Sequence, residues 1–496
     1  MGNTAFPQLV DGNSRIALVD DDGQATYHDV NTRIEKFATG LLVRRHDLNE
    51  ERVAFIIPAS LDYVTVMHGI WRAGGIAIPL NAASAEDELE HYLTNASVTR
   101  VIANPEFQIS VRALCERLSI ELLAVSDVLA DSPSRLPDLA ANRRAMILFT
   151  SGTTSKPKGV VLTHNMIRAQ ITTLVAAWEW SENDVIPLFL PLHHIHGIIN
   201  VLSCALWSGA TVQLMPKLDM PKLCAEVAAD TYSVVMAVPT IYVKLIDYID
   251  QLEHGEAQSI CDGFGRMRLN VSGSAACPVK VFNQWRELTG QVLLERYGMT
   301  EVGMGISNPY NEERRAGYVG QALPGVTVQL FDEDDNPISA DETPGEIRMQ
   351  GENVFKEYWN KPEATEESFR DGWFCSGDIA VIEDGYIRIM GRSSIDIIKS
   401  GGYKLSALEI EGVLLTHDDI NEVAVIGVQD DTWGESVAAV VGLRDGASLE
   451  YSDLKQWCKG KMSAYKIPKK LRILDALPRN AMGKVTKPAL KDTIEW

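Results

Sequence analysis

The sequence is poor in cysteine and contains no long apolar run. Its 496 residues include 7 cysteines, none of them in a Cys-x-x-Cys pair, so we expect buried thiols in a reducing compartment rather than a disulfide framework. The best apolar candidate, Val64 to Leu80, is broken by His68 and Arg72, and no membrane span is expected. The first residues lack a basic stretch followed by an apolar one, which predicts a cytoplasmic protein.

Positive charge is also scarce. Lys and Arg number 46 against 67 Asp and Glu, a net charge of −21. Such a chain is a poor general nucleic-acid binder, because phosphate contacts need a surplus of basic residues. The exception is the segment from Lys455 to Lys491, which holds eleven basic residues and one acid, Asp475. This segment is either the solvated face of a small domain or a basic lid that meets polyanions at a cleft.

Short β-branched runs alternate with helical patterns through most of the chain, which favours parallel sheets covered by helices. At roughly 150 residues per domain the length predicts about three structural units. The predicted strands are 52–58, 76–80, 100–103, 185–190, 211–215 and 234–238, and the predicted helices are 61–73, 86–94, 198–207 and 222–229.

The pattern changes in the last third of the sequence. From Gly325 onward, short strands and acidic turns indicate a small β-rich subdomain. Beyond Arg392, helices at 405–415 and 454–462 and strands at 422–428, 437–443 and 470–474 are predicted. The predicted fold is therefore α/β, with a large N-terminal domain, 1–391, of parallel or mixed sheets and a β-rich subdomain. A small mobile α+β domain, 392–496, follows it.

The strongest chemical pattern is a loop rich in hydroxyl residues between two apolar runs. Residues 150–159 read Thr-Ser-Gly-Thr-Thr-Ser-Lys-Pro-Lys-Gly. Such a loop offers backbone N–H groups, hydroxyl donors and two lysines, which together suit a phosphate group. It differs from the kinase-type P-loop, in which Gly-Lys-Ser/Thr leads into a helix. A flexible surface hairpin is the alternative, and the flanking strands 146–149 and 160–162 argue against it.

This loop resembles the signature loop of the adenylate-forming superfamily, which includes acyl-CoA synthetases, luciferases and peptide-synthetase adenylation domains. Four further segments agree with the family, in family order, across nearly the whole chain. The resemblance implies ATP and coenzyme A as small-molecule substrates and Mg²⁺ as a cofactor. The loop residues that it assigns to ATP are Thr150, Ser151, Gly152, Thr153, Thr154 and Lys158.

The segment from Tyr297 to Glu301 resembles the family's adenine and metal segment. An aromatic ring such as that of Tyr297 can stack on a purine. Thr300 and Glu301 can hold a phosphoryl oxygen and Mg²⁺, which commonly takes one or two protein carboxylates beside substrate phosphates. Upstream, the small residues that let a nucleotide lie against the backbone are Ser272, Ser274 and Ala275.

Two segments near the predicted domain boundary also match the family. Asp378, in Ser-Gly-Asp, resembles the ribose-binding aspartate, and Arg392 would reach the ribose or phosphate. Lys399, Gly401 and Gly402 resemble the loop that lines the pantetheine tunnel, where glycines permit close backbone approach. Arg392 and Lys399 are seven positions apart rather than the family's six, so the hinge residue stays open between Ser394 and Asp396.

The last segment, residues 478–484, reads Pro-Arg-Asn-Ala-Met-Gly-Lys and resembles the segment that carries the family's catalytic lysine. By that resemblance Lys484 bridges the substrate carboxylate and the α-phosphate. An ammonium group there stabilises charge that builds up on phosphorus. Taken alone, an exposed lysine at this place would be read as simply solvated.

Two residues bear on which acid is activated. The loop 191–197, Pro-Leu-His-His-Ile-His-Gly, resembles the family's acyl-site loop, with His194 as the gate and His196 facing the acyl group. Three such histidines could also suggest a zinc site, but no cysteine or carboxylate accompanies them in the loop. Arg296, next to Tyr297, is a cation that needs an anionic partner if it is buried. The alternative is that Arg296 pairs with Glu295 or Glu301.

The residues around Arg296, with the histidine loop and the run 307–317, resemble those of malonyl-CoA synthetases. We therefore expect a ligase that converts a small dicarboxylate, malonate first, into an acyl-adenylate and then into a thioester. A ligase for methylmalonate, succinate or a short monocarboxylate remains open, as does an adenylation enzyme that loads a carrier-protein thiol. A regulator with a decayed site is disfavoured by the presence of Glu301, Asp378 and Lys484.

Overall fold

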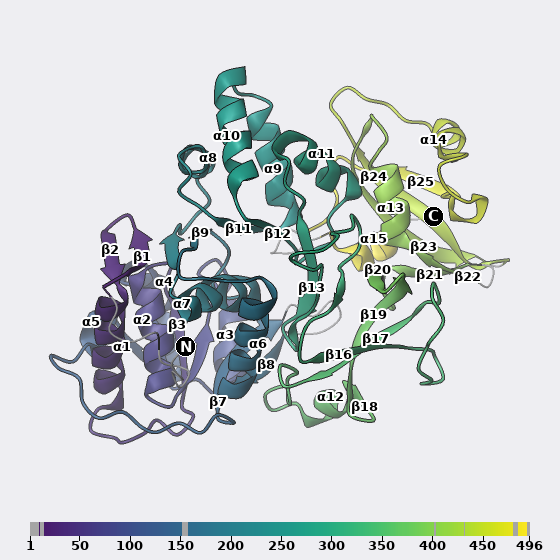
Figure 1. Ribbon diagram of the computed structural model, residues 1–496. Helices are drawn as coiled ribbons and strands as arrows, with labels where there is room; N and C mark the ends of the chain where they lie inside the picture. Colours follow the sequence, from purple (N-terminus) through teal and green to yellow (C-terminus); the bar gives the residue numbers. More distant parts are fainter. Residues whose placement is uncertain are drawn as a thin grey trace.

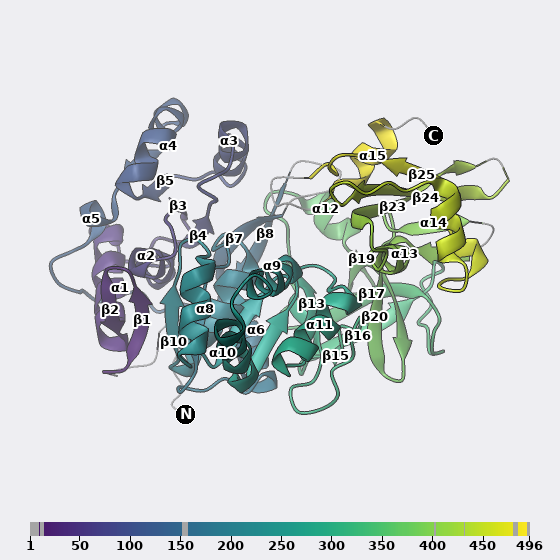
Figure 2. The same cartoon turned by 90° about the horizontal axis from the view of Figure 1, so that it is seen from above.

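The structure is a computed structural model that describes residues 9, 14–150, 157–400, 403–430, 432–479 and 485–493. It is a mixed α/β protein, which confirms the predicted fold class. Helices α1 and α2 (Tyr27–Leu42 and Leu61–Arg72) lie at one end of the molecule in both Figure 1 and Figure 2. None of the described helices combines the length and apolar character needed to cross a membrane.

The first large sheet has six strands in the order β6-β5-β3-β4-β7-β8. All neighbouring pairs are parallel except β7 and β8, which form an antiparallel hairpin around the hydroxyl-rich loop. Both strands that flank the loop are largely buried. The strands are β3 (Arg52–Ile56), β4 (Ile76–Pro79), β5 (Arg100–Ala103), β6 (Glu121–Leu123), β7 (Arg144–Thr150) and β8 (Lys158–Thr163).

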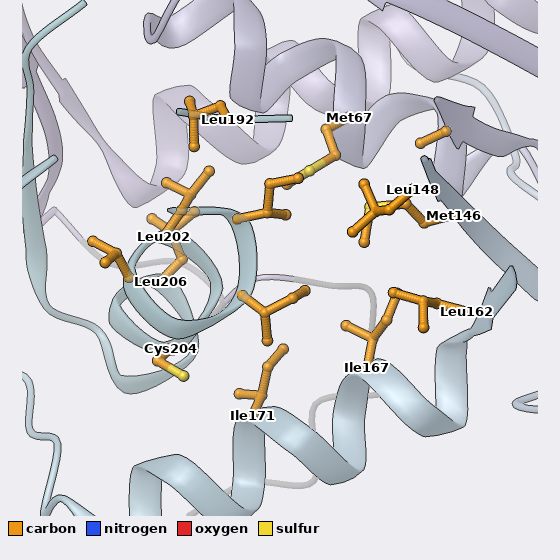
Figure 3. Close-up of a cluster of buried hydrophobic side chains, with 14 of the residues drawn as sticks. Met67, Met146, Leu148, Leu162, Ile167, Ile171, Leu192, Leu202, Cys204 and Leu206 are labelled. Carbon is orange, nitrogen blue, oxygen red and sulfur yellow. The ribbon is translucent and has the colours of Figure 1, made fainter. Parts of the chain in front are cut away.

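Both faces of this sheet are covered, because successive side chains of a strand point to opposite sides. On β7, Met146 and Leu148 join the main hydrophobic core, while Ile147 joins a separate cluster on the other face. Figure 3 shows the main core, where these two residues meet side chains of α2 and of α6 (His164–Ala177). This packing fixes both ends of the hydroxyl-rich loop.

A second sheet, β11-β12-β13-β14-β15, supplies the centre of the candidate site. Its first three strands are parallel and the last two pair antiparallel. They are β11 (Val234–Ala237), β12 (Leu269–Ser272), β13 (Leu294–Met299), β14 (Gly303–Ser307) and β15 (Gln321–Ala322). A four-stranded sheet lies before it in the chain and comprises β1 (Ile16–Asp20), β2 (Gly23–Thr26), β9 (Val185–Leu188) and β10 (Thr211–Leu214).

The β-rich texture predicted after Gly325 is an antiparallel sheet, β16-β17-β19-β18, with β20 paired to β19. Its strands are β16 (Val326–Phe331), β17 (Gly345–Gly351), β18 (Phe369–Arg370), β19 (Trp373–Glu383) and β20 (Tyr386–Arg392). Strands β19 and β20 bring Asp378 opposite Arg392 in register. Two residues predicted to bind the ribose are thus neighbours across a sheet.

The residues after Arg392 build their own sheet around two further apolar clusters. Both views place these strands with α13 and α14 at the end of the molecule opposite α1 (Figures 1 and 2). The elements are β21 (Ile397–Ser400), β22 (Tyr403–Ser406), α13 (Ala407–Leu414), β23 (Ile420–Asp430), β24 (Gly434–Leu443), α14 (Tyr451–Cys458), η2 (Ala464–Lys466), β25 (Lys470–Ile473) and α15 (Lys487–Thr493).

Several predicted helices are offset from the observed ones at their ends. The helix predicted at 222–229 is α8 (Met220–Ala228), and the one predicted at 454–462 is α14 (Tyr451–Cys458). The helix predicted from Leu405 begins at Ala407, because Ser406 is the N-cap, its side chain accepting a hydrogen bond from the Glu409 backbone N–H. The helix predicted at 198–207 is a π-helix, η1 (His196–Ser203), followed by α7 (Cys204–Ser208). The remaining described helices are α3 (Glu86–Asn95), α4 (Pro105–Leu118), α5 (Val125–Val128), α9 (Pro239–Ile249), α10 (His254–Arg266), α11 (Val279–Thr289) and α12 (Pro362–Glu367).

All seven cysteines are free thiols and six of them are buried, as predicted. The basic segment is not a uniformly solvated face. Lys466 pairs with Glu409 and Arg479 with Glu422, and Lys487 is buried between carboxylates. Part of the segment's charge is therefore matched inside the C-terminal region.

Candidate active site

A cavity of about 2410 Å³ opens where β13, β19, the start of η1 and the start of α15 meet. Most of the described residues singled out in the sequence line this one cavity. They are Thr150, Lys158, His194, His196, Ser272, Ser274, Ala275, Arg296, Tyr297, Thr300, Glu301, Asp378 and Arg392. Residues from five separate parts of the chain thus converge on one space.

The other predicted residues do not line this cavity or lie outside the described part of the chain. Lys399 is largely exposed, and its Nζ lies 3.3 Å from a carboxylate oxygen of Glu333. Ser151, Gly152, Thr153, Thr154, Gly401, Gly402 and Lys484 fall outside the described residues.

Arg296 is a buried cation with no carboxylate partner among the described residues. It is 4% exposed, and burial lowers the pKa of its guanidinium to about 9. The predicted alternative, a pair with Glu295 or Glu301, does not occur. Glu295 and Arg296 point to opposite faces of β13 because they are consecutive in a strand, and Glu301 accepts from Tyr358 instead.

Ser274 joins the two residues predicted to face the acyl group. Its Oγ lies 3.1 Å from Nδ1 of His196 and 3.5 Å from Nη2 of Arg296. Ser274 has a φ of 68°, in the left-handed region that non-glycine residues rarely adopt. A Cβ at Gly273 would lie 2.4 Å from Cζ of Arg296, so a larger residue there would displace the guanidinium. The turn after β12 is thus shaped around the guanidinium.

The polar atoms around Ser274 are only partly satisfied. Nε of Arg296 and Nε2 of His196 are buried and have no hydrogen-bond partner among the residues that the structure describes. Burial, reinforced by the charge of Arg296, holds the pKa of His196 well below its usual value, so its ring is neutral. A guanidinium and a neutral imidazole with unused nitrogens favour an anionic ligand, because unpaired buried donors cost free energy.

His196 also begins the π-helix. At the end of this helix the Cys204 backbone N–H donates to the Ile199 carbonyl, five positions earlier, as in a π-helical turn. π-helical turns are rare and occur frequently at functional sites. The preceding histidines, His193 and His194, contact each other with ring centroids 4.2 Å apart. No cluster of three metal-ligating side chains is found in the described part of the chain.

A second polar group lies on the other side of β13. The Tyr297 hydroxyl donates to Asp378 Oδ2, and Nε of Arg392 lies 2.9 Å from Asp378 Oδ1. Burial raises the pKa of Asp378 although Arg392 opposes the shift. The carboxylate is therefore held by two partners while it lines the cavity. The sequence did not indicate the bond between Tyr297 and Asp378, since these residues are 81 positions apart.

A third group lies near the hydroxyl-rich loop. Glu301 is 6% exposed, and its Oε1 accepts a hydrogen bond of 2.8 Å from the Tyr358 hydroxyl. Nζ of Lys158 lies 4.3 Å from the centroid of the same tyrosine ring. Sequence reasoning missed Tyr358, although an aromatic residue next to the run Trp-Asn-Lys-Pro was visible.

The two hinge candidates differ in their surroundings. Ser394 is exposed, whereas Asp396 is 9% exposed. Asp396 Oδ2 accepts a 3.0 Å hydrogen bond from the Arg392 backbone N–H, and Asp396 Oδ1 pairs with Lys487. Asp396 thus ties the end of β20 to α15.

Comparison with known proteins agrees with this geometry. The family model described as AMP-binding enzyme matches residues 8–359, and the AMP-binding enzyme C-terminal domain matches residues 409–484. The chain is 41% identical to the protein named malonate–CoA ligase ACSF3, mitochondrial, of Mus musculus, over 96% of this chain and 88% of that protein.

Two solved structures also match this chain over nearly its whole length. ATP-bound MatB from Rhodopseudomonas palustris matches with a TM-score of 0.89 and 33% identity, covering 98% of this chain and 96% of that one. A malonyl-CoA ligase ternary product complex with methylmalonyl-CoA and AMP matches at 0.70 and 32% identity, covering 96% and 100%. Because the first family model alone spans well over half of the sequence, this chain belongs to the AMP-binding enzyme family.

Proposed function

We propose that this chain is an AMP-forming ligase that joins malonate to coenzyme A at the expense of ATP. The observation that carries the proposal is the buried Arg296, unpaired among the described residues, with His196 and Ser274 beside it. A dicarboxylate supplies the missing anion with its far carboxylate and leaves its near carboxylate free to react. The name of the mouse relative, a malonate–CoA ligase, supports this choice.

In the first step the near carboxylate attacks the α-phosphorus of ATP in line, and pyrophosphate leaves. The bond to the α-phosphorus forms as the bond to the β-phosphate oxygen breaks. Lys484, at the carboxylate and α-phosphate, and Lys158, at the loop, stabilise the negative charge of the transition state. Thr150, Ser151, Gly152, Thr153 and Thr154 hold the departing phosphates, and Thr300 holds the α-phosphate.

The nucleotide is held by the groups around β13. Asp378, fixed by Tyr297 and Arg392, accepts hydrogen bonds from the ribose hydroxyls. Adenine lies against the small residues Ser272, Ser274 and Ala275, next to the ring of Tyr297. Both contacts fix the α-phosphate relative to the acid, so that the reaction of two bound substrates proceeds as an effectively unimolecular step.

Glu301 is suited to be a ligand of Mg²⁺. It faces the cavity, Tyr358 occupies only Oε1, and Oε2 makes no hydrogen bond within the described residues. Mg²⁺ bound with ATP would neutralise part of the phosphate charge. Mg²⁺ sites commonly use one or two protein carboxylates beside the phosphates of the substrate.

In the second step the thiolate of coenzyme A attacks the acyl carbon and AMP leaves. We propose that the domains are 1–391 and 392–496, that Asp396 is the hinge, and that rotation exchanges Lys484 for Gly401 and Gly402 at the acyl-adenylate. Lys399 then lies at the pantetheine tunnel, and His194 gates the acyl site.

The cytoplasmic location expected from the sequence stays a prediction, and the mouse relative is named mitochondrial. Cell fractionation decides between the two locations.

The decisive experiment is a pyrophosphate-release assay with the purified chain, ATP and Mg²⁺ over a panel of acids. We expect malonate to give the highest kcat/KM, ahead of methylmalonate, succinate, acetate and propionate. Product analysis with and without coenzyme A must yield malonyl-CoA and AMP. A thioester formed only on an added carrier protein would favour the carrier-loading alternative, and the absence of AMP with every acid would refute the proposal.

A further inference from the structure

A short connector between β17 and α12 links the hydroxyl-rich loop to the Glu301 turn. At one end, the Phe355 backbone N–H donates to the Glu301 carbonyl at 2.7 Å. At the other end, Tyr358 forms a β-bridge with Val160, and the Trp359 backbone N–H donates to the Gly159 carbonyl at 2.8 Å. Two parts of the site that are far apart in the sequence are therefore joined through these few residues.

The Tyr358 side chain repeats this link inside the cavity wall. Its hydroxyl donates to Glu301 Oε1 at 2.8 Å, and Nζ of Lys158 lies 4.3 Å from its ring centroid. The ring is 6% exposed and packs edge-on against Phe355, with centroids 4.7 Å apart. The hydroxyl stays protonated at neutral pH, since burial and the charge of Glu301 raise its pKa above the usual value. Tyr358 is thus a fixed donor to one group and a fixed surface for the other.

We propose that Tyr358 is a positioning residue that sets the Glu301 carboxylate for the divalent cation and the Lys158 ammonium for the departing phosphates. The inference rests on the proposed function, which assigns Glu301 to the metal and Lys158 to the phosphates. One side chain then fixes the relative position of the two charged groups that act on the phosphates.

The physical argument has two parts. A glutamate carboxylate can rotate about its side-chain bonds, and a hydrogen bond to Oε1 fixes its plane while Oε2 stays available to a cation. Loss of a side chain that holds a metal ligand in this way commonly lowers metal affinity by about 10–100-fold. A lysine is a flexible point charge, and an aromatic face attracts the ammonium and narrows its range. The hydroxyl and the ring therefore act on different ligands and can be separated by mutation.

The test measures Mn²⁺ binding to the full chain with saturating ATP and no acid, so that nothing turns over. Free Mn²⁺ is followed by electron paramagnetic resonance. Tyr358→Phe keeps the ring and removes the donor, and we expect its Mn²⁺ dissociation constant to rise about 10-fold or more. The matched control is Tyr27→Phe, which removes another buried hydroxyl bond, 2.7 Å to the Ala210 carbonyl, away from the cavity; its Mn²⁺ affinity should equal that of the wild type.

The ring is tested by pyrophosphate binding without metal. Tyr358→Phe should bind pyrophosphate like the wild type, whereas Tyr358→Leu should bind it several-fold more weakly, as Lys158→Met does. Equal pyrophosphate binding by Tyr358→Leu and the wild type would overturn the part of the proposal that concerns Lys158.

Two variants separate this inference from the proposed function. If Glu301→Gln binds Mn²⁺ like the wild type, the metal role of Glu301 fails and the inference about it falls too. If Glu301→Gln loses Mn²⁺ but Tyr358→Phe does not, only the inference is overturned. In a Glu301→Asp variant the shorter side chain already withdraws the carboxylate from the Tyr358 hydroxyl, so adding Tyr358→Phe should not weaken Mn²⁺ binding further. If Tyr358→Phe weakens Mn²⁺ binding as much in this variant as in the wild type, the two residues do not act together.

Discussion

Nζ of Lys487 lies 2.5 Å from Oδ1 of Asp396 and so connects the first residue of α15 to the proposed hinge. The same nitrogen is 2.7 Å from Oε1 of Glu411, on α13, and all three side chains are largely buried. Both carboxylates raise the pKa of Lys487 and outweigh the opposing effect of burial. One cation is thus shared by two buried acids where three elements meet.

Lys487→Met should lower the free energy of unfolding of the C-terminal region by about 3–5 kcal/mol, because it leaves two buried carboxylates without their cation. Urea unfolding followed by far-UV circular dichroism measures this loss. Lys491→Met is the matched control on the same helix, because Lys491 is half-exposed and lies 3.8 Å from Glu435. We expect about 0.5 kcal/mol or less from it. Equal effects of the two changes would show that the buried ion pairs are not stabilising.

The elements that the sequence predicted best are those with a clear period. The strand at 100–103 agrees residue for residue with β5, since its apolar run is bounded by turn residues. Where a helix follows a strand without a break, the pattern fails. Leu405 is apolar like the helix after it, so the sequence pattern places it in that helix. The structure places it in β22, which ends at Ser406, the residue that caps the helix.

The candidate site was predictable to the extent that its chemistry lies within short segments. Arg296 could be identified because it stands directly before Tyr297, in the segment that resembles the family's adenine and metal segment. Contacts between distant segments leave no local trace. Tyr358 meets Glu301 across 57 positions, and Lys487 meets Asp396 across 91. Such pairs depend on sheet order and connector geometry, which no single stretch of sequence encodes.

Arg296→Ala should lower kcat/KM for malonate by about 100-fold or more, because a bound carboxylate loses a charged, buried partner. Propionate and acetate, which have no second carboxylate, should lose little. The measurement is the ratio of kcat/KM for malonate to that for propionate. Arg286→Ala, an exposed arginine on α11, should leave the ratio unchanged. An unchanged preference for malonate in Arg296→Ala would remove the substrate assignment.

The same arginine predicts an unusual pH dependence. Burial lowers the pKa of Arg296 to about 9, so the free enzyme loses this cation as the pH rises through about 9. Above that value kcat/KM for malonate should fall about tenfold per pH unit relative to that for propionate. A ratio of the two that stays constant from pH 7 to pH 10 would show that this charge does not hold the far carboxylate.

Lys484→Ala should abolish formation of the acyl-adenylate and spare the second step. The ammonium group acts on charge at the α-phosphorus, which exists only in the first transition state. Pyrophosphate exchange measures the first half-reaction, and thioester formation from supplied malonyl-adenylate and coenzyme A measures the second. A similar loss in both half-reactions would contradict the proposed alternation of the C-terminal domain.

Glu295→Gln should change how stability depends on pH. Burial raises the pKa of Glu295 from 4.5 to about 8, although the Gly317 and Cys277 backbone N–H groups oppose the shift. Between these values the unfolded chain is ionised at this residue while the folded chain is protonated, so unfolding releases a proton and stability falls as the pH rises. The contribution is complete below pH 4.5 and is lost by about pH 8. Glutamine does not titrate, so the difference in melting temperature between the variant and the wild type should move in the variant's favour from pH 5 to pH 8. A difference that is constant over this range would mean that Glu295 is already ionised in the folded protein.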